Sequence, residues 1–180
     1  SSWQDYGPTR VYHFDEFYRH TETEEIMGED VYKTFVNPEP RISLTYLLGS
    51  SASLKAAYTR NVQYLQLLSN TTSPFTSLEV WVPAGPNIQA RKADQVSVGY
   101  FRDIIAEKLQ FSAEAYFKKI YNEIDYTEHA SLLLNPLFEG ELRFGDARAY
   151  GLEFLLRRKT GKLNGWIAYT WSRAFKTIAD

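Results

Sequence analysis

The chain has 180 residues, no cysteine, and a formal net charge of −2 from 20 Lys+Arg and 22 Asp+Glu. The balanced charge argues against non-specific nucleic-acid binding, and the absence of cysteine excludes disulfide scaffolds, cysteine zinc sites and thiol catalysis. No run of 18 or more apolar residues is present, so no membrane-spanning helix is predicted. No signal peptide is recognisable, and because the sequence does not begin with Met we expect a piece of a longer protein.

Apolar and polar residues alternate with a period of two in several segments, which is the pattern of strands with two different faces. In the clearest segment, Leu109–Lys118, the apolar residues are at odd positions and most polar residues at even positions. Aromatic residues make up 16% of the chain, and tyrosine outnumbers phenylalanine, which favours strands that are apolar on one side and wet on the other. We expect strands at about residues 41–48, 53–62, 94–103, 109–126, 147–158 and 163–175.

The connections between these segments alternate in length. Short turns separate the two strands of each pair, whereas long loops are expected at about residues 1–40, 63–94 and 127–147, the first of them irregular. In an up-and-down meander every short turn then lies at one end and every long loop at the other, as in outer-membrane barrels. Residues 1–180 are therefore predicted to form one partial domain of the all-β class, an antiparallel meander from a large transmembrane β-barrel.

A soluble fold remains an alternative at this point. Glu114, Lys118 and Glu153 lie opposite apolar stripes, where they could face either a wet barrel lumen or the water outside a β-sandwich. A sandwich would bury the apolar residues of Leu109–Phe117 against a second sheet and would suit a carbohydrate-binding or adhesin-like module. The asymmetry of loop lengths favours the barrel.

Several segments resemble motifs of TonB-dependent outer-membrane receptors. Residues 82–100 (VPAGPNIQARKADQVSVGY) resemble the stretch that ends an extracellular loop and enters a descending strand, although Ala90 and Arg91 replace the usual Pro-Glu. Residues 53–61 and 147–153 resemble two further strand motifs of the family. Residues 64–70 resemble the following loop in receptors of the Bacteroidetes type.

This resemblance implies a function and a location. The chain would come from the C-terminal half of a barrel of about 22 strands in the bacterial outer membrane, and would supply wall and ligand-capturing loops for nutrient uptake. The implied partners are membrane lipid, the TonB energy-coupling system, a plug domain absent from this chain, and a nutrient that is a glycan, peptide or chelate. A surface lipoprotein partner is left open. No cofactor and no nucleic-acid partner is expected.

Aromatic residues in or beside the long loops are the candidate ligand-binding residues, because aromatic faces bind sugars and other ring-shaped nutrients. The alternative is that they pack the loops against one another or cap the barrel rim. The candidates are Trp3, Tyr6, Tyr64, Phe75, Trp81, Phe138 and Phe144.

No catalytic or metal-ligating residue is predicted, and a small enzyme on a soluble barrel is the weakest alternative. His13 and His20 lie among carboxylates, and the acidic stretch Asp15–Asp30 could offer oxygen ligands, but solvated loop residues are the favoured interpretation. Glu139 and Glu141 would point the same way on an extended chain, as in a paired-carboxylate site. A polar strand face or a loop explains them better, since no enzyme motif accompanies them.

Overall fold

The computed structural model of the chain describes residues 2–6, 9–28, 31–70, 78–104, 108–126, 135 and 137–178. Its main element is a six-stranded antiparallel sheet in the order β12-β11-β10-β9-β6-β5. The strands of this sheet are β5 (Arg41–Leu47), β6 (Ala52–Gln63), β9 (Arg91–Ile104), β10 (Leu109–Tyr126), β11 (Leu142–Arg158) and β12 (Gly165–Ile178). The sheet is open, with β5 and β12 at its two edges. The prediction of an all-β antiparallel meander is confirmed.

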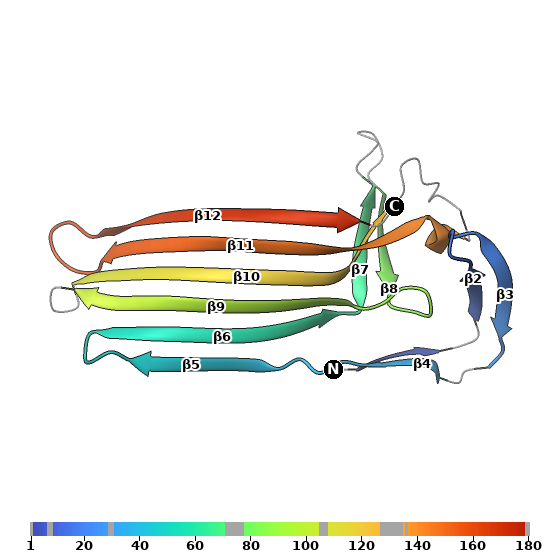
Figure 1. The fold of residues 1–180 in the computed structure, drawn as a ribbon, viewed down its shortest axis with the longest axis horizontal. Coiled ribbons are helices and arrows are strands. Elements are labelled where there is room, and N and C mark those ends of the chain that lie inside the picture. The colour runs from blue at the N-terminus through green and yellow to red at the C-terminus, as the bar shows by residue number, and fades with distance from the viewer. Residues whose placement is uncertain are drawn as a thin grey trace.

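The connections within the sheet lie at opposite ends according to their length (Figure 1). The strand ends that the short connections join, between β5 and β6, between β9 and β10 and between β11 and β12, all lie at one end. In the first of these turns, the backbone N–H of Leu48 donates to the carbonyl of Ala52 at 2.8 Å. Gly49 has a φ of +77°, which a residue without a Cβ adopts at little cost. We call this end of the sheet the turn end.

The opposite end, which we call the loop end, carries three two-stranded antiparallel ribbons: β1 with β4, β2 with β3, and β7 with β8. Their strands are β1 (Ser2–Tyr6), β2 (Thr9–Phe14), β3 (His20–Ile26), β4 (Val31–Val36), β7 (Leu65–Asn70) and β8 (Leu78–Pro83). The expectation of an irregular segment before Arg41 is therefore wrong. These strands are short and pair only in twos, so they leave little periodicity for a sequence window to detect.

The strand register places the apolar positions of all six strands on one side of the sheet. Ala115 of β10, for example, lies opposite Val98 of β9 and Leu152 of β11. We call this side the apolar face. Its residues are Ile42, Leu44, Tyr46, Leu54, Ala56, Tyr58, Val96, Val98, Tyr100, Phe111, Ala113, Ala115, Phe117, Tyr150, Leu152, Phe154, Leu156, Ile167, Tyr169 and Trp171.

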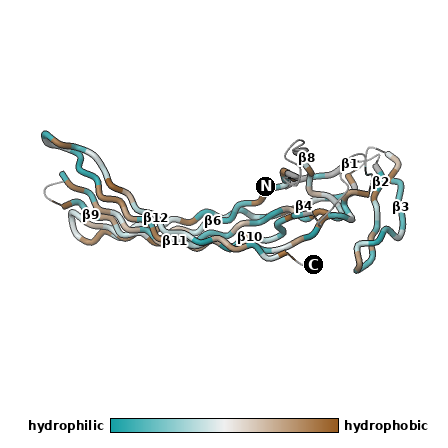
Figure 2. Tube along the Cα trace, turned by 90° about the horizontal axis from the view of Figure 1, so that it is seen from above, coloured by the Kyte–Doolittle hydropathy of each residue, from teal (hydrophilic) through white to brown (hydrophobic). Residues whose placement is uncertain are grey.

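No second layer covers the apolar face in the described residues. Leu44 is 67% exposed, Val98 51% and Phe117 48%. Figure 2 shows the sheet as a single layer, with apolar and polar residues alternating along the strands. The β-sandwich alternative required these side chains to be buried against another sheet, so it is contradicted. An apolar surface of this extent on a protein is typical of a surface that contacts lipid or another protein.

The other side of the sheet is polar and includes Lys55, Glu114 and Glu153. Gly99 allows close packing on this side: a Cβ built there would lie 2.7 Å from a ring carbon of Phe101. The Lys55 ammonium lies 4.5 Å from the centre of the same ring. A pocket of about 510 Å³ opens beside this ring near the turn end and is lined by polar residues such as Glu114 and by apolar residues such as Leu155.

Among the described residues, no helix is long and apolar enough to cross a membrane. The one short helical element in these residues is the 3-10 turn η1 (Phe138–Glu141), which immediately precedes β11.

Candidate functional site

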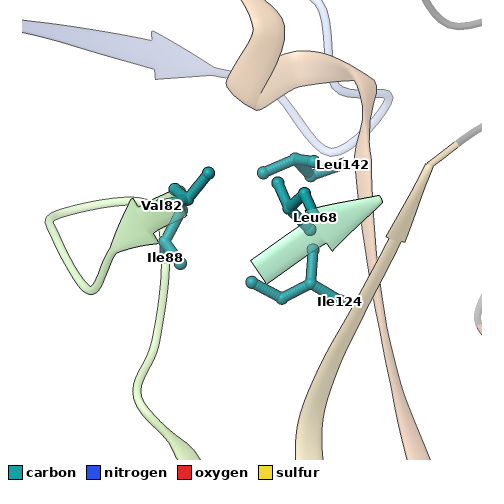
Figure 3. Close-up of a cluster of buried hydrophobic side chains, with 5 residues drawn as sticks. All are labelled: Leu68, Val82, Ile88, Ile124 and Leu142. Atoms are coloured by element: carbon teal, nitrogen blue, oxygen red, sulfur yellow. The ribbon is translucent and has the colours of Figure 1, made fainter. Parts of the chain in front are cut away.

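The loops pack around a small hydrophobic core of their own at the loop end. Its five buried side chains come from β7, β8, the segment between β8 and β9, and the loop-end parts of β10 and β11 (Figure 3). We call them the loop cluster: Leu68, Val82, Ile88, Ile124 and Leu142. Leu142 and Ile88 are the largest side chains that are fully buried in the described residues. The second long loop and the loop-end parts of β10 and β11 therefore share one buried core.

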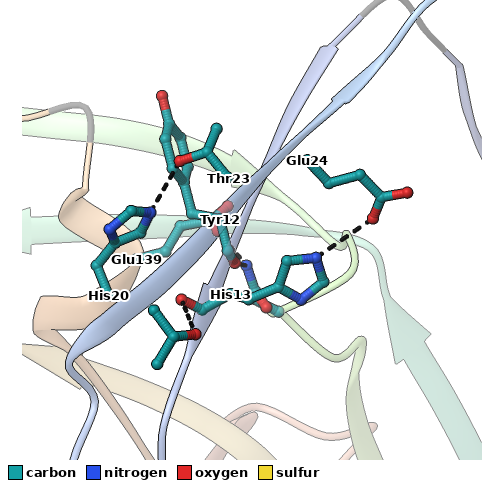
Figure 4. A network of polar contacts seen from close by, with 8 residues as sticks. Tyr12, His13, His20, Thr23, Glu24 and Glu139 are labelled. Atoms are coloured by element: carbon teal, nitrogen blue, oxygen red, sulfur yellow. Dashed lines mark hydrogen bonds and ion pairs between the residues drawn. The ribbon is translucent and has the colours of Figure 1, made fainter.

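A single amide side chain connects three of the long loops. Asn87, between β8 and β9, donates through Nδ2 to the backbone carbonyl of Tyr12 on β2 at 2.7 Å. The same nitrogen donates to Oε2 of Glu139 on η1 at 2.6 Å. Figure 4 shows Tyr12 and Glu139 within one network of polar contacts. Because the two partners lie far from Asn87 in sequence, these bonds fix the loops relative to one another.

The β2–β3 ribbon also packs directly on η1. A Cβ built on Gly140 would lie 2.7 Å from a ring carbon of Phe14, so only glycine permits this approach without a shift. The Arg143 guanidinium lies 3.8 Å from the centre of the Tyr18 ring, at a cation–π distance. Contacts from two different directions therefore hold the first loop against the third.

The Asn87 bonds give a testable prediction. We expect Asn87→Ala to leave the sheet intact but to lower the free energy of opening of the loops by about 1–3 kcal/mol. This is the cost of removing the donor from two part-buried acceptors, the Tyr12 carbonyl and the Glu139 carboxylate. Hydrogen exchange of the β2 and η1 amides in the full receptor measures this. Asn164→Ala, in the turn between β11 and β12, is the matched control. Equal exchange in both variants would contradict a connecting role for Asn87.

The two histidines of the first loop bond within their own ribbon (Figure 4). His13 Nε2 lies 3.3 Å from Oε2 of Glu24, and His20 Nε2 lies 2.8 Å from Oγ1 of Thr23. Both pairs are solvent-exposed. In the ranges that the structure describes, no three His, Asp or Glu side chains come together to hold a metal ion. His129 lies outside the described residues.

The acidic stretch of the first loop is used for local structure. Asp15 Oδ1 accepts hydrogen bonds from the backbone N–H groups of Phe17 and Arg19, at 2.9 and 2.8 Å, and so shapes the turn between β2 and β3. Glu25 pairs with Arg10 across the ribbon at 2.9 Å. These contacts fit the solvated-loop interpretation of the stretch.

The chain is not extended at Glu139 and Glu141, so the geometry of a paired-carboxylate site is not present there. Both lie on η1, where three residues complete a turn and residues two apart point to different sides. The Glu139 carboxylate instead accepts the bond from Asn87.

Three of the predicted ligand-binding aromatics pack against protein. Phe138 and Phe144 pack against the loop cluster. The Tyr64 ring centre lies 6.5 Å from that of Phe35, and the Tyr64 hydroxyl accepts a hydrogen bond from Asn37 Nδ2 at 3.3 Å. These contacts match the alternative that the loop aromatics pack the loops together.

Of the four remaining candidate aromatics, the structure describes the side chain of one. Trp81, on β8, is 62% exposed, whereas its neighbour Val82 is buried. Trp3 and Tyr6 lie on β1, but their side chains are outside the described residues, as is the whole of Phe75. Among the candidates whose side chains the structure describes, Trp81 is the most exposed.

A small polar pocket of about 150 Å³ lies near these loops, between β4 and the segment that enters β9. Its lining includes Lys33, Lys92 and Gln89. Lysine and amide side chains are residue types that can bind a small anionic group, such as a carboxylate. Sequence analysis did not single out these residues, because lysines in long loops carry no distinguishing pattern.

Comparison with protein families gives one match, to the family described as TonB dependent receptor-like, beta-barrel, over residues 10–180. Searches of curated proteins and of solved structures returned no match. Members of this family are outer-membrane receptors and transporters of Gram-negative bacteria. The matched region includes all six strands of the sheet and most of the loop-end ribbons. The chain therefore belongs to the TonB-dependent receptor-like β-barrel family.

Proposed function

We propose that the chain forms part of the wall and extracellular loops of an outer-membrane receptor that takes up a nutrient. The single observation that carries this proposal is the one-layered sheet, whose exposed apolar face includes Val98 and Phe117. Lipid accounts for such a face, because a barrel wall is apolar outside and polar inside. The sheet edges β5 and β12 would then pair with further strands of a larger barrel.

The position of the loops supports the second half of the proposal. Long loops of outer-membrane barrels face outward and short turns face the periplasm. The loop cluster and the Asn87 bonds would hold the loop end as a preorganised surface, which lowers the entropic cost of binding. Uptake through the lumen would require a plug domain and the TonB system, both outside this chain. The ligand would be a glycan, a peptide or a chelate, with a surface lipoprotein as a further candidate partner.

Trp81 provides the test of ligand capture. Cells with the full receptor, the Trp81→Ala variant or no receptor are exposed to fluorescent panels of glycans, peptides and ferric chelates. We expect one panel member to bind only receptor-bearing cells, and Trp81→Ala to weaken that binding about fivefold, since one aromatic contact contributes roughly 1 kcal/mol.

Trp166→Ala is the matched control, because Trp166 is 69% exposed but lies at the turn end. It should bind like the wild type. Binding of no panel member above the level of receptor-free cells would contradict the proposed capture function.

A further inference from the structure

Four basic side chains lie across the sheet where the apolar face ends toward the loops. They come from β6, β10, β11 and β12. We call them the basic belt: Arg60, Lys119, Arg148 and Arg173. The register places Lys119 opposite Arg148 and also opposite Asp94, the partner of Arg60, while Arg173 lies opposite Tyr150, two residues nearer the turn end.

Side-chain contacts place the basic belt on the same side of the sheet as the apolar face. The Tyr58 hydroxyl, from the apolar face, donates to Asp94 Oδ1 at 2.7 Å, and Arg60 donates to the same oxygen at 2.7 Å. The Arg173 guanidinium lies 5.6 Å from the Trp171 ring centre. The belt is therefore continuous with the apolar face and points away from the polar side of the sheet.

Arg148 and Lys119 of the belt also lie beside aromatic rings. The Tyr150 ring, from the apolar face, stacks on Phe175 with centres 6.1 Å apart. The Arg148 guanidinium lies 5.1 Å from the centre of that Phe175 ring. The Lys119 ammonium lies 4.5 Å from the Tyr121 ring centre. Basic groups resting on aromatic rings at the border of an apolar surface are typical of a membrane interface.

Acidic side chains on this side of the sheet neutralise only part of the belt. Asp94 is engaged by Arg60 in a two-pronged pair at 2.7 and 2.9 Å. Asp146 lies 3.8 Å from Lys119, and both side chains are about half exposed. In the described part of the chain, neither Arg148 nor Arg173 forms an ion pair, and both residues are exposed. The belt keeps a positive charge with donors available to an anion.

We propose that the basic belt binds the phosphate groups of lipids in the outer leaflet of the membrane around the barrel. The inference rests on the proposed function, which places the apolar face in lipid and the loops outside. Lipid phosphates lie where the apolar region of a bilayer ends, which is the level of the belt. Guanidinium groups bind phosphate through paired hydrogen bonds. A soluble extracellular ligand fits less well, because the belt continues a lipid-facing surface.

The test uses the full receptor in neutral detergent micelles that contain either phosphatidic acid or diacylglycerol, which lacks the phosphate. Lipid molecules retained per receptor are counted by native mass spectrometry. We expect preferential retention of phosphatidic acid, reduced about tenfold in the triple variant Lys119→Gln/Arg148→Gln/Arg173→Gln. Retention should also fall with added salt, because exposed charges are screened.

The matched control is Lys55→Gln/Lys118→Gln, which removes two cations from the polar side of the sheet. It should retain phosphatidic acid like the wild type. Heat-dependent gel mobility verifies that each variant is folded, and single Arg148→Gln and Arg173→Gln variants replace the triple variant if it is not. Equal retention by wild type and belt variants would overturn the proposal.

Two further outcomes separate the explanations. Displacement of the lipid by millimolar inorganic phosphate would identify a general anion site and overturn the lipid assignment. Lipid retention by the belt without binding of any nutrient at the loops would refute ligand capture alone and leave the belt in place.

Discussion

Val98→Arg is expected to destabilise the receptor in lipid vesicles by about 2–4 kcal/mol, the cost of placing a guanidinium at the depth of the bilayer midplane. Val98 is 51% exposed and lies between Ala56 and Ala115 in the middle of the apolar face. Reversible guanidinium chloride unfolding, followed by tryptophan fluorescence in vesicles, measures the loss.

The neighbouring substitution Ser97→Arg is the matched control, because successive strand residues point to opposite faces. On the polar side of the sheet, the guanidinium keeps its hydration, so we expect a change well below that of Val98→Arg. If the two substitutions cost the same, or if Val98→Arg is neutral, the apolar face does not contact lipid.

Leu142→Ala is expected to cost the loop end about 2–5 kcal/mol, the range for removing a buried leucine side chain from a packed core. Leu142 is 0% exposed and is surrounded by the other members of the loop cluster. The damage should be confined to the loops, because the cluster lies at the loop end and not within the apolar face. Limited proteolysis of the full receptor in vesicles should show faster cleavage of the loops while the barrel stays resistant.

Leu163→Ala, at a position that is 74% exposed in the turn between β11 and β12, is the matched control. It should be cleaved like the wild type. Unchanged loop cleavage in Leu142→Ala would mean that the loop cluster does not hold the loops together.

The sheet could be predicted because its physical cause is local. A strand in a barrel wall is apolar on one side along its whole length, so Leu109–Phe117 alternates without tertiary information. The lengths of the connections then separate the turn end from the loop end. Both features follow from residues adjacent in the chain.

The loop end could not be predicted in the same way, because its contacts join distant residues. The members of the loop cluster share no periodicity, and the Asn87 bonds join side chains from three loops. Strict alternation along β10 would place Ile124 on the polar side of the sheet, but the structure places it on the other side. The ladder between β10 and β11 is irregular between Ile120 and Glu123, and Asn122 there has a φ of 57°. This bulge exchanges the two faces beyond it.

The candidate ligand-binding residues illustrate the same limit. An aromatic side chain in a loop can contact a ligand or pack against another loop, and the sequence pattern is identical in both cases. Phe138 and Phe144 pack against the loop cluster, whereas Trp81 is exposed. Only the tertiary positions of β7, β8 and η1 distinguish them.

The central claim, that the apolar face of the sheet lies in lipid, is tested most directly by spin labels along β10. This chain contains no native cysteine, so single cysteines can be introduced one at a time from Phe111 to Phe117 in a receptor that carries no other reactive cysteine. Collisions with oxygen report lipid, and collisions with a water-soluble nickel chelate report water. We predict strict alternation, with Phe111, Ala113, Ala115 and Phe117 oxygen-accessible. Uniform nickel accessibility at those positions would contradict the account.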